Sequence, residues 1–515
     1  MGQVTLSSPL RISLFSPGMT SLHRAGTAGL WMTLKALDMD DTTPDWKRRT
    51  GGSWELGPTE VVLHWSGKAE PFFQALIAAS FRLDKHGLVW FPALGPPTAS
   101  SRAIQHALVL QGALLESFLQ HGLSRKADSP QQPQGSLSID VDGHITTASF
   151  RRIQSYKHQT ARVDVERTSS AVVGWQFPGG AERHSALGRA TALEEPLNRW
   201  LALLFAPVGC LYFETKSYFS SGFRPRYAIV IPDVLNLPEY AELRTLFAHA
   251  GTETFKVAGL SEAVLRVITG LESSRAGQRL GFDSCEVVAF AVLPWSSQQK
   301  TRLQVFRAMA RPEMDYASFE VCRNLLHPRL RSRVKDGETW WDVPQVPELV
   351  ARNLIRGRPW WNGFADFVAD RGLRTHVFKY EADGLAGMVG ESRIFSDGPG
   401  KVIVVACQQA LRNHMGKKFA RPGGARWESE FTKVRISISR CKTAIDLRET
   451  LTDFWARNGP LDALKGRWPE ILPLLTGGWR ESRDLALLAL ASYQPTQFDG
   501  SENRSKIEEE VGTET

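Results

Sequence analysis

The stretch SLHRAGTAGLWMTLKALD, residues 21–38, predicts a helix whose second half is ordinary and whose first half is not. Leucines recur at helical spacing through the second half. Gly26 and Gly29 stand one turn earlier, where each glycine is less favourable than alanine by roughly 0.5–1 kcal/mol. Close packing of this helix on a sheet would offset that loss, and we expect such packing.

The start of the same helix carries an electrostatic conflict. Thr20 or Ser21 is a good N-cap. His23 and Arg24 follow, where the positive end of the helix dipole disfavours cations. A bound anion would remove the conflict, so Arg24 is a candidate contact to a phosphate. Plain packing of the helix on a sheet is the alternative, and we favour it.

The composition indicates a globular protein with an anionic partner. The chain has 515 residues, 42% of them hydrophobic, which is enough for a sizeable core and several domains. Its net charge is +8, with a pI near 9.2. No apolar run reaches the roughly 18–20 residues that span a bilayer, and the first residues have no signal-peptide pattern. We therefore expect a cytoplasmic protein with no membrane partner.

The sequence lacks the motifs of common catalytic and metal sites. Its five cysteines are widely separated and never form a C-x-x-C pair, which argues against a disulfide framework and against a zinc finger. The segment DGPGKV at 397–402 lacks the first glycine and the Ser or Thr of a Walker A motif, and no H-E-x-x-H or G-x-S-x-G occurs. The sequence therefore predicts a binding protein and not an enzyme, with no catalytic residue, no metal and no cofactor.

Two other classes of function stay open. A nuclease could assemble a site from scattered acids such as Asp38, Asp40 and Asp41, although the run MDDTTPD is typical of a polar loop. A stand-alone transcriptional regulator is the other alternative, and the lack of a recognisable helix-turn-helix weakens it.

Signals of strands and helices divide the chain into two parts and a tail. They alternate through residues 1–384 and predict a mixed α/β body with a polar, proline-bearing joint at 124–135. Residues 385–495 are mainly helical and predict a bundle, and the acidic residues 496–515 predict a disordered tail. The predicted fold class is α+β, an N-terminal mixed α/β body followed by a C-terminal all-helical bundle.

One long helix is expected to carry the seam of this bundle. From Trp427 to Ile445 its apolar residues are spaced 4, 3, 4, 3 and 4, which is typical of helix packing. Arg426, Lys433 and Arg440 recur every seven residues and would form one stripe beside the seam, a spacing that suits a phosphate backbone.

Three basic segments are candidates for nucleic-acid contacts. The helical region 411–442 has nine cations against two acids, and in HPRLRSRVK alternate cations would share one face of a strand. In KSYFSSGFRPRY cations and aromatic rings are interleaved in a loop between two strands. The candidate residues are Lys417, Lys418, Arg421, Arg426, Lys433 and Arg440 in the first segment, Arg329, Arg331, Arg333 and Lys335 in the second, and Lys216, Arg224 and Arg226 in the third.

Each basic segment also has a structural alternative. The helical stripe could be a solvated bundle face, and the basic-aromatic loop could dock another protein. The doublets Trp340-Trp341 and Trp360-Trp361 could stack bases, but tryptophans more often belong to a core.

Four quoted stretches resemble one protein family in their order and spacing. They are LFSPGMTSLHRAGTAGLWMTLKAL near the start, RYAIVIPDVLNL in the middle, and LRETLTDFWARNG followed by WPEILPLLTGGWRESRDLALLALASY near the end. Together they resemble the large subunit of type I CRISPR effector complexes, in the subtype first named for Myxococcus. The resemblance extends over almost the whole chain.

The resemblance implies a subunit at the foot of a CRISPR RNA-guided surveillance complex (Cascade), beside backbone and foot subunits and the RNA 5′ end. It implies help in recognising the protospacer-adjacent motif, in opening target DNA into an R-loop and in holding the unwound strand. It also implies recruitment of a helicase-nuclease or of transposition proteins, and in some systems a small subunit made from an internal start, for which Met388 is the candidate. It assigns no residue to motif reading.

Overall fold

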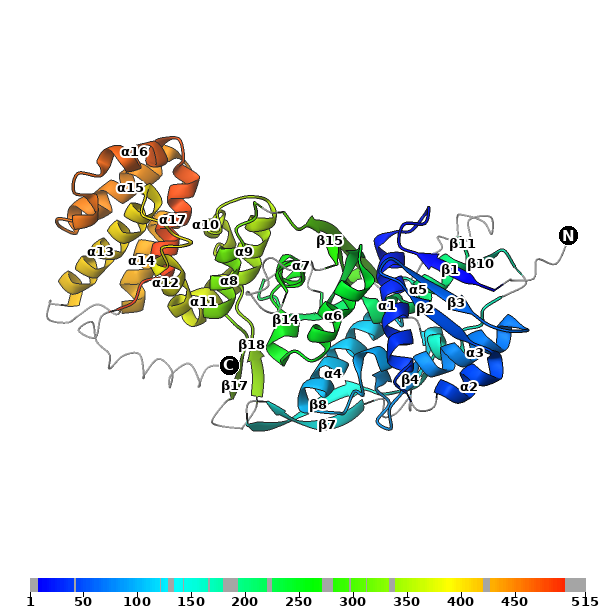
Figure 1. Ribbon diagram of the computed structural model, residues 1–515. Coiled ribbons are helices and arrows are strands. Elements are labelled where there is room, and N and C mark those ends of the chain that lie inside the picture. The colour runs from blue at the N-terminus through cyan, green and yellow to red at the C-terminus, as the bar shows by residue number, and fades with distance from the viewer. Residues whose placement is uncertain are drawn as a thin grey trace. The chain divides into compact units, whose positions relative to one another are not determined.

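The chain forms two compact units. The computed structural model describes residues 8–40, 43–120, 122–127, 134–141, 143–164, 167–178, 193–219, 225–270, 281–295, 298–311, 313–332, 339–419 and 427–495 (Figure 1). The first unit comprises Met1–Ser217, Phe223–Pro312 and Pro328–Val343, and the second comprises Tyr218–Gly222, Glu313–His327 and Pro344–Thr515. The chain therefore passes from one unit to the other more than once.

The first unit contains all of the described strands. A five-stranded sheet has the order β14 (Lys256–Val257), β12 (Leu211–Thr215), β13 (Tyr227–Val234), β15 (Phe282–Trp295) and β16 (Gln298–Met309). Only the β12–β14 pair is parallel. A second, antiparallel sheet has the order β1 (Leu10–Ser13), β3 (Glu60–His64) and β2 (Ser53–Leu56).

Five two-stranded pairs complete the strands of the first unit. They are β4 (Arg82–Leu83) with β5 (Val89–Trp90), β6 (Arg125–Ala127) with β9 (Ile153–Tyr156), β7 (Gln134–Val141) with β8 (His144–Arg151), β10 (Ser169–Ala171) with β11 (Glu194–Pro196), and β17 (Arg329–Ser332) with β18 (Thr339–Asp342).

The helices of the first unit precede its longest hairpin, β15–β16. They are α1 (Ser21–Leu37), α2 (Thr43–Thr50), α3 (Ala69–Ser80), α4 (Ser101–Glu116), α5 (Leu197–Gly209), α6 (Leu237–Ala248) and α7 (Leu260–Thr269). Short 3₁₀ turns are η1 (Pro92–Leu94), η2 (Gly122–Ser124), η3 (Lys157–Thr160), η4 (Gly174–Gln176) and η6 (Thr252–Phe255).

In its described part the second unit contains only helices. They are α8 (Tyr316–Leu325), α9 (Val346–Ile355), α10 (Phe364–Phe367), α11 (Arg371–Tyr380), α12 (Ala382–Gly390), α13 (Pro399–Phe419), α14 (Trp427–Ser439), α15 (Ala444–Arg457), the 3₁₀ turn η8 (Asp462–Leu464), α16 (Trp468–Thr476) and α17 (Trp479–Ala491). The predicted α+β class, a mixed body followed by a helical bundle, is confirmed. The predicted boundary at 384–385 falls within α12, and the tail 496–515 lies outside the described residues.

Helix α1 is the central element of the first unit, because it is buried on nearly every side. It contacts α5, α6 and strand β13. Strand β13 is itself a nearly continuous run of buried apolar residues, as expected of a strand covered on both faces. Helix and strand together join the sheet to the helical layer around it.

The glycines of α1 make its contact with α5 possible. A Cβ on Gly26 would lie 1.9 Å from the carbonyl oxygen of Ala202, and a Cβ on Gly29 would lie 2.3 Å from that of Phe205. From the other side, a Cβ on Gly209 of α5 would lie 1.8 Å from the carbonyl oxygen of Ala25. The two backbones therefore touch. Helix α1 does pack on a sheet, as predicted, through its contact with β13, but the glycines themselves meet helix α5.

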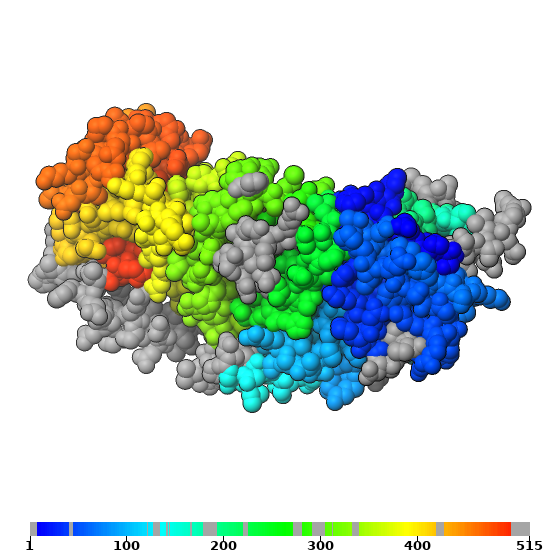
Figure 2. Space-filling model, viewed as in Figure 1, coloured from blue at the N-terminus to red at the C-terminus, as the bar shows by residue number. Residues whose placement is uncertain are grey.

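Helix α17 is the corresponding central element of the second unit. All residues from Leu485 to Ala491 are buried, and α17 contacts α10 and each of α12 to α16. In the space-filling view the orange residues of the last helices lie together at one end of this unit (Figure 2), and α15, α16 and α17 contact one another. The C-terminal half of α17 is apolar on all sides, which is typical of a helix in the centre of a bundle.

The predicted single helix from Trp427 to Ile445 is wrong, because it is two helices. Helix α14 ends at Ser439, and α15 begins at Ala444 after a turn. The Thr443 hydroxyl accepts a hydrogen bond from the backbone N–H of Asp446, whose carboxylate accepts one from the N–H of Thr443, both at 3.1 Å. This capping box starts a new helix and interrupts the old one.

The break also ends the apolar seam. Val434, Ile438 and Cys441 are buried as predicted, but Ile445 is 57% exposed. The stripe of cations is interrupted at the same place, since Arg440 lies in the turn after α14. Among the described residues, no helix is both long and apolar enough to cross a membrane.

Replacing Gly26 by alanine should destabilise the first unit by about 1–3 kcal/mol, because the new methyl group would overlap a backbone carbonyl that cannot rotate away. Gly416→Ala is the matched control, since Gly416 is a helical glycine of α13 with open space where its Cβ would stand. That change should be neutral or stabilise by up to about 1 kcal/mol. Urea unfolding of both variants measures the difference, and a Gly26→Ala protein as stable as its parent would refute the backbone contact.

Candidate nucleic-acid interface

The first turn of α1 finds its anions inside the protein. The Arg24 guanidinium donates hydrogen bonds to the Asp233 carboxylate at 3.0 Å and to the carbonyl oxygen of Leu14 at 3.1 Å. The His23 ring lies 3.6 Å from the Glu195 carboxylate, and burial lowers the pKa of His23. The conflict that suggested a phosphate ligand is thus resolved within the chain, and the proposed role of Arg24 loses its motivation.

The two described cations of the loop 216–227, Lys216 and Arg226, have partners within the first unit. The Lys216 ammonium donates to the carbonyl oxygen of Trp341 at 2.7 Å, and burial lowers the pKa of Lys216. Arg226 is 70% exposed and forms an ion pair with Glu116 at 3.2 Å. Arg224 lies outside the described residues. Of the two described candidates in this loop, Arg226 is therefore the one whose side chain is mostly open to a ligand.

Two aromatic members of the same loop, Tyr218 and Phe219, pack within the second unit. The Tyr218 ring stacks on His376 with centroids 4.2 Å apart, and the Phe219 ring meets Phe367 edge to face at 6.3 Å. The backbone N–H of Tyr218 donates to the side chain of Gln345 at 3.1 Å. These rings are used for packing, which is the structural alternative for them.

Residues Arg329–Ser332 of the segment HPRLRSRVK form strand β17, as the extended interpretation requires. Arg329 and Arg331 lie two residues apart on β17, which pairs with β18, so they share one face. Arg331 forms an ion pair with Asp342 at 2.6 Å. Arg329 is exposed and has no partner in the described part of the chain. Arg333 and Lys335 lie outside that part.

The two tryptophan doublets differ in exposure. Trp360 is 1% exposed and donates its indole N–H to the carbonyl oxygen of Ile394 at 3.2 Å, so it belongs to the core of the second unit. Trp340 and Trp341 are half-buried on β18. Trp361 is half-buried too, and its ring meets Phe395 with centroids 4.9 Å apart. Base stacking thus stays a prediction for Trp340 and Trp341, and Trp360 is too buried to take part.

In the helical unit, three of the predicted cations are neutralised or hydrogen-bonded internally. The Glu430 carboxylate is 7% exposed and lies 2.6 Å from the Lys433 ammonium and 3.4 Å from that of Lys418. The His414 ring lies 3.3 Å from it. Lys417 donates to the carbonyl oxygen of Arg457 at 2.7 Å. This region is less basic at its surface than its composition indicates.

Arg440 is the predicted cation of this unit that the fold leaves available. It is exposed in the turn between α14 and α15, and it has no side-chain partner among the residues that are described. Lys442, two residues later, is also exposed. Arg421 and Arg426 lie outside the described residues. Of the predicted stripe of cations at seven-residue spacing, the structure therefore describes Lys433 and Arg440.

The acids of the alternative nuclease site are used in separate ion pairs. Asp38 lies 2.7 Å from the Lys47 ammonium, and Asp40 lies 2.6 Å from the Arg82 guanidinium. Asp41 is outside the described residues. Within the described ranges no three His, Cys, Asp or Glu side chains are grouped as a metal site would need. These contacts weigh against a carboxylate cluster at Asp38 and Asp40.

A pocket in the first unit was not predicted from the sequence. Lys157, Arg162 and Trp175 line it together with Trp200 of α5. Trp200 belongs to a later element than the other three residues, and no pattern in the sequence links it to them. The nearest signal is the proximity of Lys157, Arg162 and Arg167, which a census of local basic residues would have found.

Comparison with known proteins finds a matching domain family for each end of the chain and one relative that matches nearly the whole of it. Residues 11–204 match the DevT N-terminal domain, and residues 392–515 match the DevT C-terminal domain. The chain is 31% identical to the CRISPR-associated protein Cas8a1/Csx13 of Myxococcus xanthus (strain DK1622) over 528 aligned positions, which cover 95% of this chain and 89% of that protein.

The Glu430 cluster should make the second unit sensitive to acid. The hydrogen bond from Lys433, together with those of His414 and the charge of Lys418, outweighs burial and lowers the pKa of Glu430 to about 2. A carboxylate with a lowered pKa stabilises the fold fully above its unfolded pKa of about 4.3, and this stabilisation is lost as the pH falls towards 2.

Glu430→Gln should therefore destabilise the protein by on the order of 2 kcal/mol at neutral pH, and the difference from the parent should shrink below about pH 4.5. Thermal unfolding across this pH range measures it. Glu428→Gln is the control, because Glu428 is exposed on the same helix. A gap between Glu430→Gln and the parent that stays constant with pH would contradict the ion-pair account.

Proposed function

The chain belongs to the family of the CRISPR-associated protein Cas8a1/Csx13, and we propose that it is the nucleic-acid-binding large subunit of a type I CRISPR RNA-guided effector complex. The observation that carries the proposal is the match to that relative over 95% of the chain, with separate matches of its two terminal domains. We infer that the subunit binds and does not catalyse. Its partners would be CRISPR RNA, target DNA, and the backbone and foot subunits of Cascade, in the cytoplasm.

Within such a complex we assign two tasks to the chain, one for each unit. The first unit would help recognise the protospacer-adjacent motif, for which the exposed Arg226 and Arg329 are candidate contacts. The second unit would hold the unwound strand after the duplex opens, for which Arg440 is the candidate. Base pairing with the guide would supply the sequence specificity, so these protein contacts need only engage the short motif and the phosphate backbone.

The assembled complex would then recruit a helicase-nuclease or transposition proteins. A small subunit translated from Met388 would contain the whole of the matched C-terminal domain at 392–515. It would, however, begin inside α12, where Met388 is fully buried, and it would lack α8 to α11. The internal product thus requires the remaining helices to pack without these neighbours.

Purification of the tagged full chain from its own host tests the proposal. The chain should carry one discrete RNA and several other subunits in fixed proportion, because a large subunit is held by both. Intact mass measurement of the same sample would show whether a product beginning at Met388 is present. A chain that elutes alone and free of nucleic acid at about 50 mM salt, where phosphate contacts are strong, would contradict the proposed function.

Arg440→Glu should shorten the time for which the assembled complex holds a pre-opened DNA bubble, while initial motif binding changes less. The loss of one phosphate contact to a single strand should also lower the slope of log affinity against log salt by about 0.7. Lys465→Glu is the matched control, since Lys465 is exposed elsewhere in the same unit. Equal dissociation rates for Arg440→Glu, the control and the parent would remove Arg440 from the interface.

A further inference from the structure

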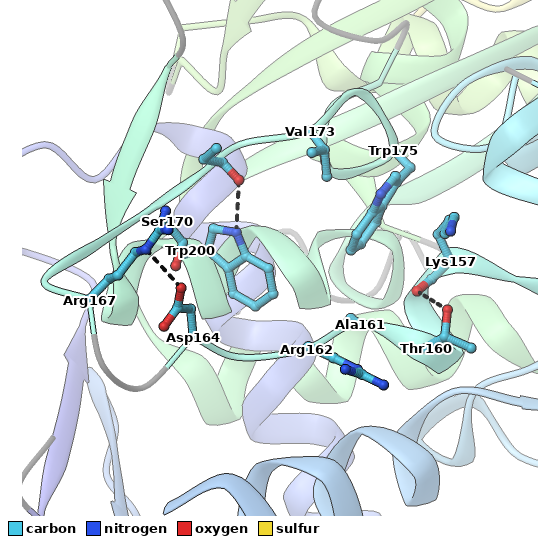
Figure 3. Close-up of a pocket in the computed structure, with 11 residues that line it drawn as sticks. Lys157, Thr160, Ala161, Arg162, Asp164, Arg167, Ser170, Val173, Trp175 and Trp200 are labelled. Atoms are coloured by element: carbon cyan, nitrogen blue, oxygen red, sulfur yellow. Dashed lines mark hydrogen bonds and ion pairs between the residues drawn. The ribbon is translucent and has the colours of Figure 1, made fainter. Parts of the chain in front are cut away.

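A pocket among the described residues lies in the first unit and has a volume of about 510 Å³, which is in the range of small-ligand sites. It is formed by η3, the residues that follow it, β10, η4 and α5. Figure 3 shows Trp175, Lys157 and Arg162 on one side of the space, and Trp200 with Arg167 and Asp164 on the other.

The charge of the pocket is suited to a phosphate. Arg167 forms an ion pair with Asp164 at 3.1 Å, so these two side chains compensate each other. Lys157 and Arg162 are exposed and have no partner in the described part of the chain. Two uncompensated cations thus line the side on which Trp175 stands, as Figure 3 shows. An anionic group there would neutralise both of them.

Trp175 is held as a fixed aromatic surface. It lies in the 3₁₀ turn η4, which is closed by the Gln176 side chain accepting a hydrogen bond from the backbone N–H of Val173 at 3.1 Å. Behind it, the buried His158 ring meets the indole edge to face, with centroids 4.7 Å apart. Complete burial lowers the pKa of His158 to about 3, so that ring is uncharged at neutral pH and acts as an aromatic neighbour.

The opposite wall is anchored to the core of the unit. Trp200 is 5% exposed, and its indole N–H donates to the carbonyl oxygen of Ala171 on β10 at 3.3 Å. Trp200 belongs to α5, the helix whose backbone touches α1. Both aromatic walls of the pocket are thus held by contacts within the unit, which limits the entropy that a ligand would lose in ordering them.

We propose that this pocket binds one unpaired nucleotide of a single-stranded nucleic acid, with the base against Trp175 and a phosphate between Lys157 and Arg162. The combination of a flat aromatic surface with adjacent cations is what a base and its phosphate need, and stacking accepts any base. This pocket would give the proposed large subunit a contact to a single nucleotide. The proposal rests on that function only for the source of the strand, which is either guide RNA or opened target DNA.

The test uses the purified full chain and fluorescent single strands of about eight nucleotides, as RNA, as DNA, and as DNA with every base removed. The parent should bind the abasic strand about tenfold more weakly than the complete strand. Trp175→Ala should weaken binding of the complete strand by about the same tenfold. It should hardly weaken binding of the abasic strand any further, since the base and the indole form a single stack. Trp175→Phe should retain most of the affinity.

Arg162→Glu keeps the test decisive if Trp175→Ala folds poorly, because Arg162 is exposed. It should weaken binding of all three strands and lower the salt slope, whereas Lys68→Glu, an exposed change elsewhere in the unit, should do neither. Preferential loss for RNA would identify the guide as the source, and preferential loss for DNA would identify the opened strand.

The proposal is overturned if Trp175→Ala and Arg162→Glu bind all strands as the parent does, or if the parent does not distinguish complete from abasic DNA. Either result would leave the proposed function intact, since that depends on co-purification with RNA and subunits. Conversely, a chain that purifies alone but shows the base-dependent loss at Trp175 would keep the pocket and contradict the effector role.

Discussion

The backbone contact between α1 and α5 is the constraint on which the first unit depends. Gly26 and Gly29 face the carbonyl oxygens of Ala202 and Phe205 so closely that no side chain fits between the helices. This contact fixes α5, and α5 in turn carries Trp200 to the wall of the pocket. It also places the first turn of α1 where Arg24 reaches Asp233 on the central strand β13. Core packing and the candidate nucleotide site therefore share one helix pair.

Ion pairs within the chain occupy some of its cations, and the cations without such a partner are the better candidates to contact a ligand. A net charge of +8 suggests a generally basic surface, yet many of the predicted contacts are already paired. Asp233 holds both Arg24 and Arg307, and Glu430 holds Lys418 and Lys433. An ion pair of this kind must be broken before either cation can bind a phosphate, so the paired residues are the weaker candidates.

The exposed cations that we propose as contacts lie in distinct places. Arg329 on the β17–β18 pair, Lys157 and Arg162 at the pocket, and Arg440 in the turn after α14 are exposed. The first three belong to the unit with the sheets and the last to the helical unit. A subunit that contacts a guided complex through small, separate sites fits a role in which base pairing supplies specificity and the protein holds backbones and single nucleotides.

Local patterns in the sequence determined the elements of this protein, and only the tertiary structure decided what their side chains do. Apolar periodicity located α1, β13 and α17, because burial of one face or of a whole element is written in neighbouring residues. The same periodicity hid the break at Thr443, since the capping box there lies within a run that keeps helical spacing. The partner helix of the α1 glycines and the acid that pairs with Arg24 are distant in the chain, and the pocket around Trp175 brings together several separate elements. Their proximity follows from packing, which local spacing does not encode.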